Sequence, residues 1–142
     1  MLAVNPYLNF PGNTEEAFNF YRSVFGGEFS LLQRFSDTSH GEMMAPAERS
    51  KIMHIALPLA GGATLMGTDA LESQGHSLQM GNNFFLTLHT ESEAEADTLF
   101  AKLSDGARIL LPLQQMFWGA YFGMLTDKFG IQWMITYEQP KN

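Results

Sequence analysis

The hydrophobic pattern of this chain changes between helical and strand-like spacing, and it runs through the same order twice. Between residues 13 and 25, acidic residues come first and apolar side chains then recur at helical spacing. Gly26 and Gly27 follow this stretch. The stretch 90–104 has the same layout and is followed by Gly106. An acidic first turn and a glycine after the last apolar residue are typical of helix ends. The sequence therefore predicts two helices, at 13–25 and 90–104.

The two predicted helices align at a constant spacing, which indicates one unit used twice. Each of five residue pairs is 79 positions apart (96 − 17, for example): Ala17 and Ala96, Phe20 and Leu99, Tyr21 and Phe100, Val24 and Leu103, and Gly27 and Gly106.

Strand-like runs flank both helices in the same order. One run precedes each helix, at 4–10 and 83–89. Three runs follow each helix, at 28–35, 51–59 and 63–67 in the first half and at 108–111, 117–126 and 131–137 in the second. We therefore predict an α+β fold with two βαβββ modules, one at about 1–70 and one at about 80–142, within a single domain, 1–142. Residues 36–50 are predicted to be a mobile loop, and 68–82 to link the halves.

Composition and charge narrow the function classes. A chain of 142 residues with 45% apolar residues is expected to fold around a sizeable core. The net charge is −7, and the eight Lys and Arg residues are scattered, which argues against a nucleic-acid partner. No stretch has the roughly 20 apolar residues that cross a bilayer, and the start of the chain does not resemble a signal peptide, so we predict a cytoplasmic protein with no membrane partner. Without cysteine, any metal would need His, Asp, Glu or amide ligands.

Five phrases resemble the PhnB-like branch of the vicinal oxygen chelate superfamily (glyoxalase/bleomycin resistance/dioxygenase). They are NPYLNF at 5–10, EAFNFYRSVFGGE at 16–28, IMHIAL at 52–57, LMGTDA at 65–70 and DKFGIQWMI at 127–135. They occur in the family's order and spacing over nearly the whole chain. One departure is Lys128, where the family more often has proline.

The resemblance implies two modules whose sheets curl around a central cavity, usually in a homodimer, although the halves could also pair by swapping between chains. It also implies a metal held at four places, on the first and last strand of each module. The repeat puts Asn5, Met66, Phe84 and Met134 at these places. Thioether sulfur is a soft ligand and phenylalanine has no donor atom, so we predict a metal-free cavity without a cofactor.

The first half supplies most of the polar candidates. Alternation predicts that Met53, Ile55 and Leu57 face the helix, whereas His54 faces the cavity as a general base or a ligand anchor. The other interpretation of His54 is a hydrogen-bonded core histidine. The remaining candidates are Asn5, Tyr7 and Asn9, which either line the cavity or satisfy loop backbone, and Asp69, which either lies at the cavity mouth or caps a turn.

The second half supplies an aromatic run at 117–123. Trp118 and Tyr121 could stack on a planar ligand, or they could belong to the core or to a dimer contact. Met66, Phe84 and Met134 would line the cavity as apolar residues. His40 and His76 are predicted to be surface residues, and His89 to be structural.

Three functions fit these residues. The first is the binding of a small organic molecule in a metal-free cavity. The second is an enzyme that uses His54 as acid or base, or a metal through ligands not yet placed. Some PhnB-like sequences carry the label demethylubiquinone methyltransferase, but no glycine-rich nucleotide loop follows a strand here. The third is a dimeric accessory protein with an aromatic interface.

Overall fold

The computed structural model describes residues 2–140 of the chain. The chain divides into two compact units, the first ending at Gln79 and the second beginning at Met80. Met1, Lys141 and Asn142 of the predicted domain lie outside the described residues. That the two units act as one domain stays a prediction.

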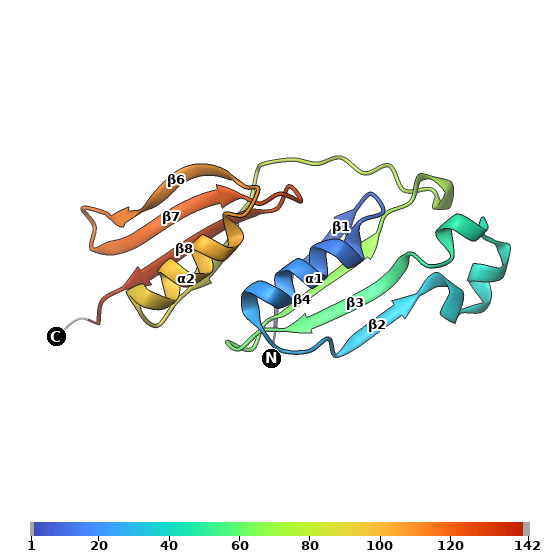
Figure 1. Ribbon diagram of the computed structural model, residues 1–142, viewed down its shortest axis with the longest axis horizontal. Coiled ribbons are helices and arrows are strands. Elements are labelled where there is room, and N and C mark those ends of the chain that lie inside the picture. Colours follow the sequence, from blue (N-terminus) through green and yellow to red (C-terminus); the bar gives the residue numbers. More distant parts are fainter. Residues whose placement is uncertain (1, 141–142) are drawn as a thin grey trace. The chain divides into compact units, whose positions relative to one another are not determined.

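The first unit is a four-stranded mixed sheet with one helix (Figure 1). Its elements are β1 (Tyr7–Phe10), α1 (Thr14–Phe25), β2 (Leu31–Arg34), β3 (Ile52–Pro58) and β4 (Thr64–Asp69). The strand order is β1-β4-β3-β2; β1 pairs parallel with β4, and the other pairs are antiparallel. The sheet is open, with β1 and β2 at its edges.

The second unit repeats this plan. Its elements are β5 (Leu86–His89), α2 (Glu93–Leu103), β6 (Arg108–Gln115), β7 (Ala120–Thr126) and β8 (Gln132–Glu138). The order β5-β8-β7-β6, again with one parallel pair, matches that of the first sheet. The predicted α+β fold with two βαβββ modules is therefore confirmed. None of the helices in the described part of the chain is long and apolar enough to cross a membrane.

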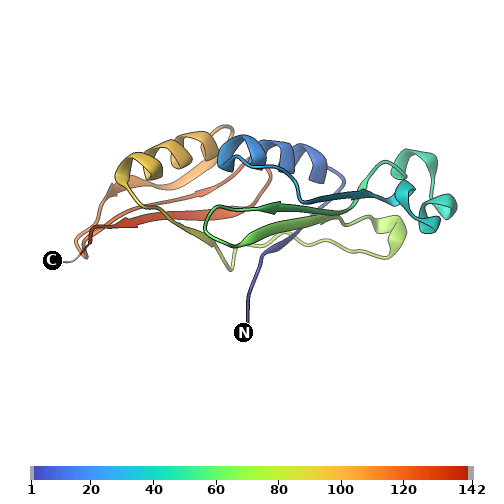
Figure 2. The ribbon, with the colours of Figure 1, turned by 90° about the horizontal axis from the view of Figure 1, so that it is seen from below.

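In each unit the helix covers one face of its own sheet (Figure 2). Helix α1 buries Ala17, Phe18 and Tyr21, which are each fully inaccessible to solvent. Burial of such aromatic side chains removes the largest apolar areas from water and is the main source of stability here. In the second unit, Ala96 and Leu103 of α2 are buried in the same way, and so is Trp133 of β8.

Residues 36–50 differ from the predicted mobile loop. They form most of three 3₁₀ helices, Phe35–Asp37, Ser39–Met43 and Pro46–Glu48. A small apolar cluster explains the order of this segment: Phe35, Met44 and Leu71 are buried together, and Met53 packs against them. A register shift between Gln33 and Arg34 of β2 takes Met53 out of the regular ladder, so the prediction that Met53 lies against α1 is wrong.

The hairpin between β6 and β7 is also placed differently from the prediction. Strand β6 continues through Pro112 to Gln115, which the sequence does not suggest because proline cannot donate to a strand ladder. Pro112 is tolerated because β6 is an edge strand. The turn follows directly, with the Gly119 N–H donating to the Met116 carbonyl and Gly119 at a φ of 97°. Phe117 and Trp118 thus lie in the turn and not, as predicted, in a strand.

The spacing of the repeat changes along the chain. Ala17 and Ala96 are both fully buried, as the helix spacing of 79 requires. In the strands, Tyr7 pairs with Met66 and Thr87 with Met134, so the spacing is 80 in the first strands (87 − 7) and 68 in the last (134 − 66). The helix spacing of 79 differs from these strand spacings by odd numbers (80 − 79 = 1 and 79 − 68 = 11). Applying 79 to a strand therefore matches residues on opposite faces.

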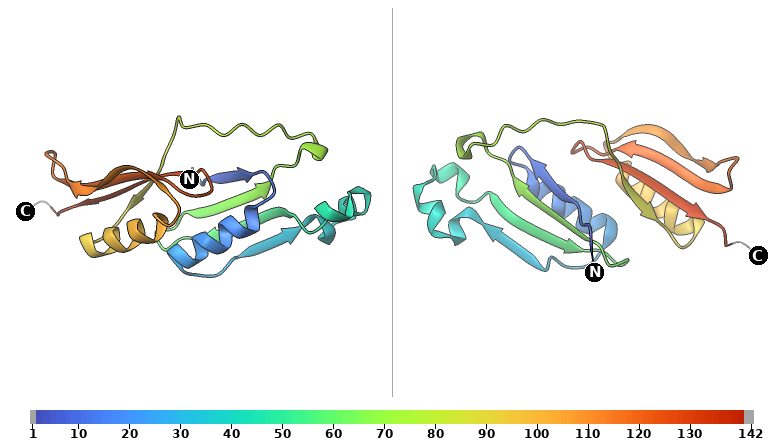
Figure 3. Two further views of the ribbon diagram at one scale, coloured as in Figure 1. Left: turned by 45° about the horizontal axis from the view of Figure 1, so that its top comes forward. Right: turned by 180° about the vertical axis from the view of Figure 1, so that it is seen from behind.

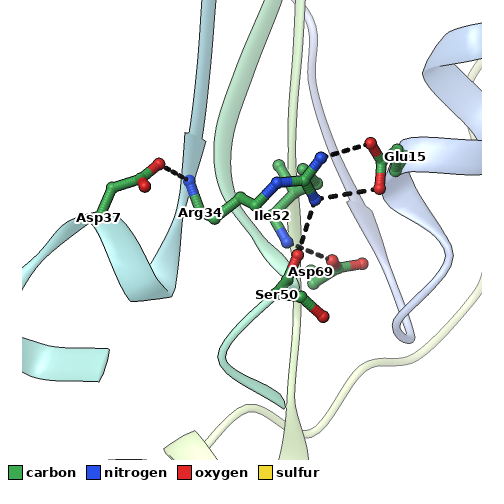
Figure 4. A network of polar contacts seen from close by, with 6 residues as sticks. All are labelled: Glu15, Arg34, Asp37, Ser50, Ile52 and Asp69. Atoms are coloured by element: carbon green, nitrogen blue, oxygen red, sulfur yellow. Dashed lines mark hydrogen bonds and ion pairs between the residues drawn. The ribbon is translucent and has the colours of Figure 1, made fainter. Parts of the chain in front are cut away.

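An ion pair joins the start of α1 to the end of β2 (Figure 4). Arg34 donates from Nη1 to Glu15 Oε1 at 3.0 Å and from Nη2 to Oε2 at 2.6 Å, and Nη1 also donates to the Ser50 carbonyl at 2.8 Å. The hydrogen bond from Arg34 lowers the pKa of Glu15 below its ordinary value of 4.5. This bidentate geometry makes the Arg34–Glu15 pair stronger than one with a single hydrogen bond.

Replacing Glu15 with glutamine should lower the free energy of unfolding at pH 7 by less than about 1 kcal/mol, because both side chains are partly exposed. The depressed pKa means that the pair stabilises the fold above pH 4.5 and that this contribution is lost as the pH falls through the folded-state value. Urea unfolding at pH 7 and pH 3 measures both effects. A difference between wild type and variant that grows toward pH 3 contradicts the prediction.

Candidate functional site

The candidate site is the face of the first sheet opposite α1, which we call the open face (Figure 3, right). Gly67 lies on the covered face, because a Cβ there would meet the Phe18 ring of α1. Its neighbours along β4 therefore point the other way. Strand pairing then assigns the open face to Tyr7 and Asn9 of β1, Gln33 and Leu31 of β2, His54 and Ala56 of β3, and Met66 and Thr68 of β4.

Tyr7 and His54 form a polar pair on the open face. The Tyr7 hydroxyl and His54 Nδ1 are hydrogen-bonded at 3.2 Å, and the ring centroids are 5.4 Å apart at 55°. The two residues come from different strands, and β4 lies between these strands. Tyr7 is 44% exposed and His54 is partly buried, so both can meet a molecule from solvent. The predicted grouping of Tyr7 with His54 on one face is what the structure contains.

The other polar candidates of the first half differ in their surroundings. Asn9 is exposed on the open face, in the same strand as Tyr7. Asn5 precedes β1, and its Oδ1 accepts a hydrogen bond of 2.9 Å from the Thr64 backbone N–H. The amide oxygen of Asn5 thus satisfies backbone, which is the alternative that the sequence left open. Met66 lies beside Tyr7 and Ala56 and gives the open face an apolar surface next to the polar pair.

Asp69 does not share the open face. It is 2% exposed on the covered face, where its Oδ1 accepts from the Thr14 N–H at 3.0 Å. Its Oδ2 accepts from the Ile52 N–H at 2.7 Å (Figure 4). Thr14 is the first residue of α1, and Asn13 makes no side-chain cap. Asp69 therefore caps α1 from a neighbouring strand, where its negative charge also favours the helix N-terminus.

The second sheet has an open face of its own, which contains the predicted residue Met134. Met134 pairs with Thr87 on one side and Met124 on the other, so these three share a face with Phe122. Thr87 Oγ1 also approaches Met134 Sδ at 3.6 Å. Met134 is a predicted site residue and Phe122 lies in the predicted aromatic run, whereas Thr87 and Met124 are not predicted. Alternation along 120–126 is the signal that could have found Met124.

The two predicted aromatic residues of the second half, Trp118 and Tyr121, lie in different surroundings. Trp118 is 53% exposed in the β6–β7 turn, where its ring meets Phe122 edge-on at 5.8 Å and Phe117 at 5.1 Å. Tyr121 alternates with Phe122 and lies on the covered face, where its hydroxyl donates to Asp97 of α2 at 2.5 Å. That bond to a carboxylate raises the pKa of Tyr121. Tyr121 thus joins β7 to α2 and does not lie with Met134.

The donor atoms do not fit the metal site that the resemblance implies. The first-strand spacing of 80 makes Phe85 the counterpart of Asn5, where the helix spacing gave Phe84. Phe84 is 61% exposed, and its carbonyl accepts from Gln132 Nε2. The four positions therefore hold one amide, two thioethers and a phenylalanine. Among residues 2–140, no three His, Asp or Glu side chains come together in a group that could hold a metal ion.

The chain is similar in sequence and structure to several known proteins. Residues 3–136 match the family described as 3-demethylubiquinone-9 3-methyltransferase. The chain is 32% identical to Protein YjdN of Escherichia coli (strain K12), over 94% of both sequences. It is 36% identical to the crystal structure of protein PA1353 from Pseudomonas aeruginosa, with a TM-score of 0.86 over 99% of this chain and 100% of that one. A putative 3-demethylubiquinone-9 3-methyltransferase, PhnB protein, from Bacillus cereus is 30% identical, with a TM-score of 0.77 over 96% and 99%.

A more distant structure shows the fold class. A glyoxalase/bleomycin resistance protein/dioxygenase family enzyme from Burkholderia phytofirmans PsJN is 18% identical, with a TM-score of 0.62 over 96% of this chain and 100% of that one. The fold is thus that of the vicinal oxygen chelate superfamily. Within it, the chain belongs to the PhnB-like, 3-demethylubiquinone-9 3-methyltransferase-like family. The predicted family is confirmed.

Proposed function

We propose that this protein binds a small organic molecule on the open face of the first sheet, with Tyr7 and His54 as the polar anchor and without a metal ion. The observation that carries the proposal is the 3.2 Å hydrogen bond between Tyr7 and His54 on a face that also holds Ala56, Met66 and Leu31. A few polar groups set in an apolar surface are the usual composition of a small-molecule site.

The second unit supports this proposal, because it has the same strand order and can be compared with the first unit position by position. The spacing of 68 that relates Met66 to Met134 also relates His54 to Phe122, and the spacing of 80 relates Tyr7 to Thr87. The second sheet has the same strand order with Phe122 and Thr87 at these positions. The architecture therefore does not require a tyrosine–histidine pair, and a role in binding accounts for it.

An enzyme that uses His54 as acid or base is the second candidate, because the same hydrogen bond would orient the imidazole for proton transfer. Methyl transfer, which the names of the matched family and the Bacillus cereus relative suggest, would need a site for a methyl donor. The sequence has no glycine-rich nucleotide loop after a strand to supply one. The homodimer implied by the resemblance stays a prediction.

A thermal-shift screen of small planar and aromatic compounds tests the binding function. A compound that binds only the folded state raises its stability by mass action, by about 2.7 kcal/mol at 100 times its Kd. Replacing His54 with alanine should weaken the binding of such a compound by about fivefold to tenfold, which corresponds to the loss of one hydrogen bond. The matched control is His76→Ala, at an exposed histidine outside the open face.

Three outcomes would overturn parts of the proposal. A compound that binds equally well to wild type and to the His54 variant removes His54 from the site. Turnover of a bound compound, followed by chromatography, favours the enzyme. One tightly held divalent ion per chain in metal analysis of the purified protein contradicts the metal-free site.

A further inference from the structure

We propose that Tyr7 holds neutral His54 in the tautomer that carries its proton on Nε2, and that the molecule bound on the open face therefore offers a carbonyl or carboxylate oxygen to this N–H. This inference rests on the proposed binding function for its second half, whereas the tautomer stands on the geometry of Tyr7 and His54 alone.

The direction of the Tyr7–His54 hydrogen bond decides the tautomer. A neutral imidazole has one N–H donor and one bare nitrogen, and a tyrosine hydroxyl can donate or accept. A phenol is the stronger donor of the two, and a bare imidazole nitrogen is a stronger acceptor than a phenol oxygen. The hydroxyl therefore donates to Nδ1 over the observed 3.2 Å, which leaves the proton of the neutral ring on Nε2.

The surroundings of His54 leave this N–H available to a ligand. Strand pairing places Gln33 opposite His54, and within residues 2–140 His54 has Tyr7 as its hydrogen-bond partner and no hydrogen bond to Gln33. No carboxylate lies among the open-face residues, and the nearest acidic residue along β4, Asp69, points to the covered face. The structure thus leaves the Nε2–H without a protein acceptor among residues 2–140, and a bound molecule can supply one.

This arrangement separates the two candidate functions. A general base needs a bare nitrogen directed at its substrate. In the proposed state the lone pair of Nδ1 is occupied by Tyr7, and Nε2 holds a proton. His54 is then a hydrogen-bond donor to its ligand, and Tyr7 is a positioning residue that acts through His54.

Nitrogen-15 NMR of the imidazole rings tests the tautomer without any ligand. At pH 8, the two ring nitrogens of a neutral histidine resonate in widely separated regions according to which one is protonated. The His54 signals are assigned by their loss in His54→Gln. We expect Nε2 in the protonated region and Nδ1 in the unprotonated region. Tyr7→Phe should move the two shifts toward each other, while Tyr121→Phe, a control in the other unit, should leave them unchanged.

Two results would overturn the tautomer. One is a proton on Nδ1 in the wild-type protein. The other is a His54 spectrum that Tyr7→Phe does not change, provided that the amide spectrum shows the variant to be folded.

The ligand class is tested with three simple probes titrated into the same sample: acetophenone, benzoate and ethylbenzene. The ring is common to all three, and only the first two carry an acceptor oxygen. Acetophenone or benzoate should bind about fivefold more tightly than ethylbenzene and should shift the His54 Nε2 signal. Comparing acetophenone with benzoate distinguishes a neutral acceptor from an anionic one. The net charge of −7 on the protein disfavours the anionic ligand.

The probes also separate the failure of this inference from the failure of the proposed function. If ethylbenzene or a donor such as aniline binds as well as acetophenone, the acceptor preference is wrong and binding on the open face stands. If neither the three probes nor aniline moves any open-face signal, binding of small aromatic molecules there is contradicted, and the tautomer result is unaffected.

Discussion

Replacing Asp69 with alanine is expected to lower the free energy of unfolding by about 3 kcal/mol. The substitution removes the acceptor of two buried backbone donors, the N–H groups of Thr14 and Ile52. A buried donor without an acceptor costs about 1–3 kcal/mol, and the bond to a charged acceptor is stronger than average. The loss is large because Asp69 caps α1 in place of Asn13, which makes no side-chain cap.

Urea unfolding followed by circular dichroism measures this loss. Asp105→Ala is the matched control, because the Asp105 side chain is 73% exposed and pairs with Lys128 at the surface; we expect this variant to lose less than about 0.5 kcal/mol. Asp69→Asn, which keeps one oxygen acceptor, should fall between the two. If Asp69→Ala is as stable as Asp105→Ala, Asp69 does not cap α1.

Replacing Gly67 with alanine is the second substitution with a large expected effect, about 2 to 3 kcal/mol. A Cβ at this position would lie 2.6 Å from Phe18 Cε1 and 3.2 Å from the Leu8 carbonyl oxygen. Phe18 is fully buried, so its ring has no space into which to retreat. Overfilling a packed core typically costs 1–3 kcal/mol.

A double variant identifies the clash. Phe18→Leu in the Gly67→Ala background should cost less than it does in the wild type, because the smaller side chain makes room for the new methyl group. Gly61→Ala is the control, since a Cβ there meets no atom within 4 Å. Strictly additive effects of Gly67→Ala and Phe18→Leu would show that Phe18 is not the obstacle.

Much of the fold follows from local patterns in the sequence. The helix at 14–25 has an acidic start, an apolar stripe and a glycine end, and these features depend only on neighbouring residues. Gly61 and Gly62 likewise mark the turn between β3 and β4 through neighbouring residues alone. The structure around Phe35 and Met44 could not be predicted like this, because those residues are ordered by contact with Leu71, far along the chain.

The candidate site was predictable to the extent that it depends on strand alternation. Tyr7, Asn9 and His54 alternate onto one face without any long-range information. The bond from Tyr7 to His54 depends on β4 lying between β1 and β3, which alternation does not reveal. The sequence leaves more than one place open for Asp69 and for Tyr121. Only their three-dimensional partners, Thr14 and Asp97, show that the two side chains point to the helices.

The difference between the two spacings of the repeat shows how this architecture can diversify. From helix to last strand the spacing falls from 79 to 68, so the first half is 11 residues longer (79 − 68) between these elements. The second half joins the corresponding strands, β6 and β7, with the short turn at Gly119, whereas the first half uses the three 3₁₀ helices. The β2–β3 connection is therefore an insertion point, where evolution or an engineer could exchange one loop for another while the paired strands keep their register.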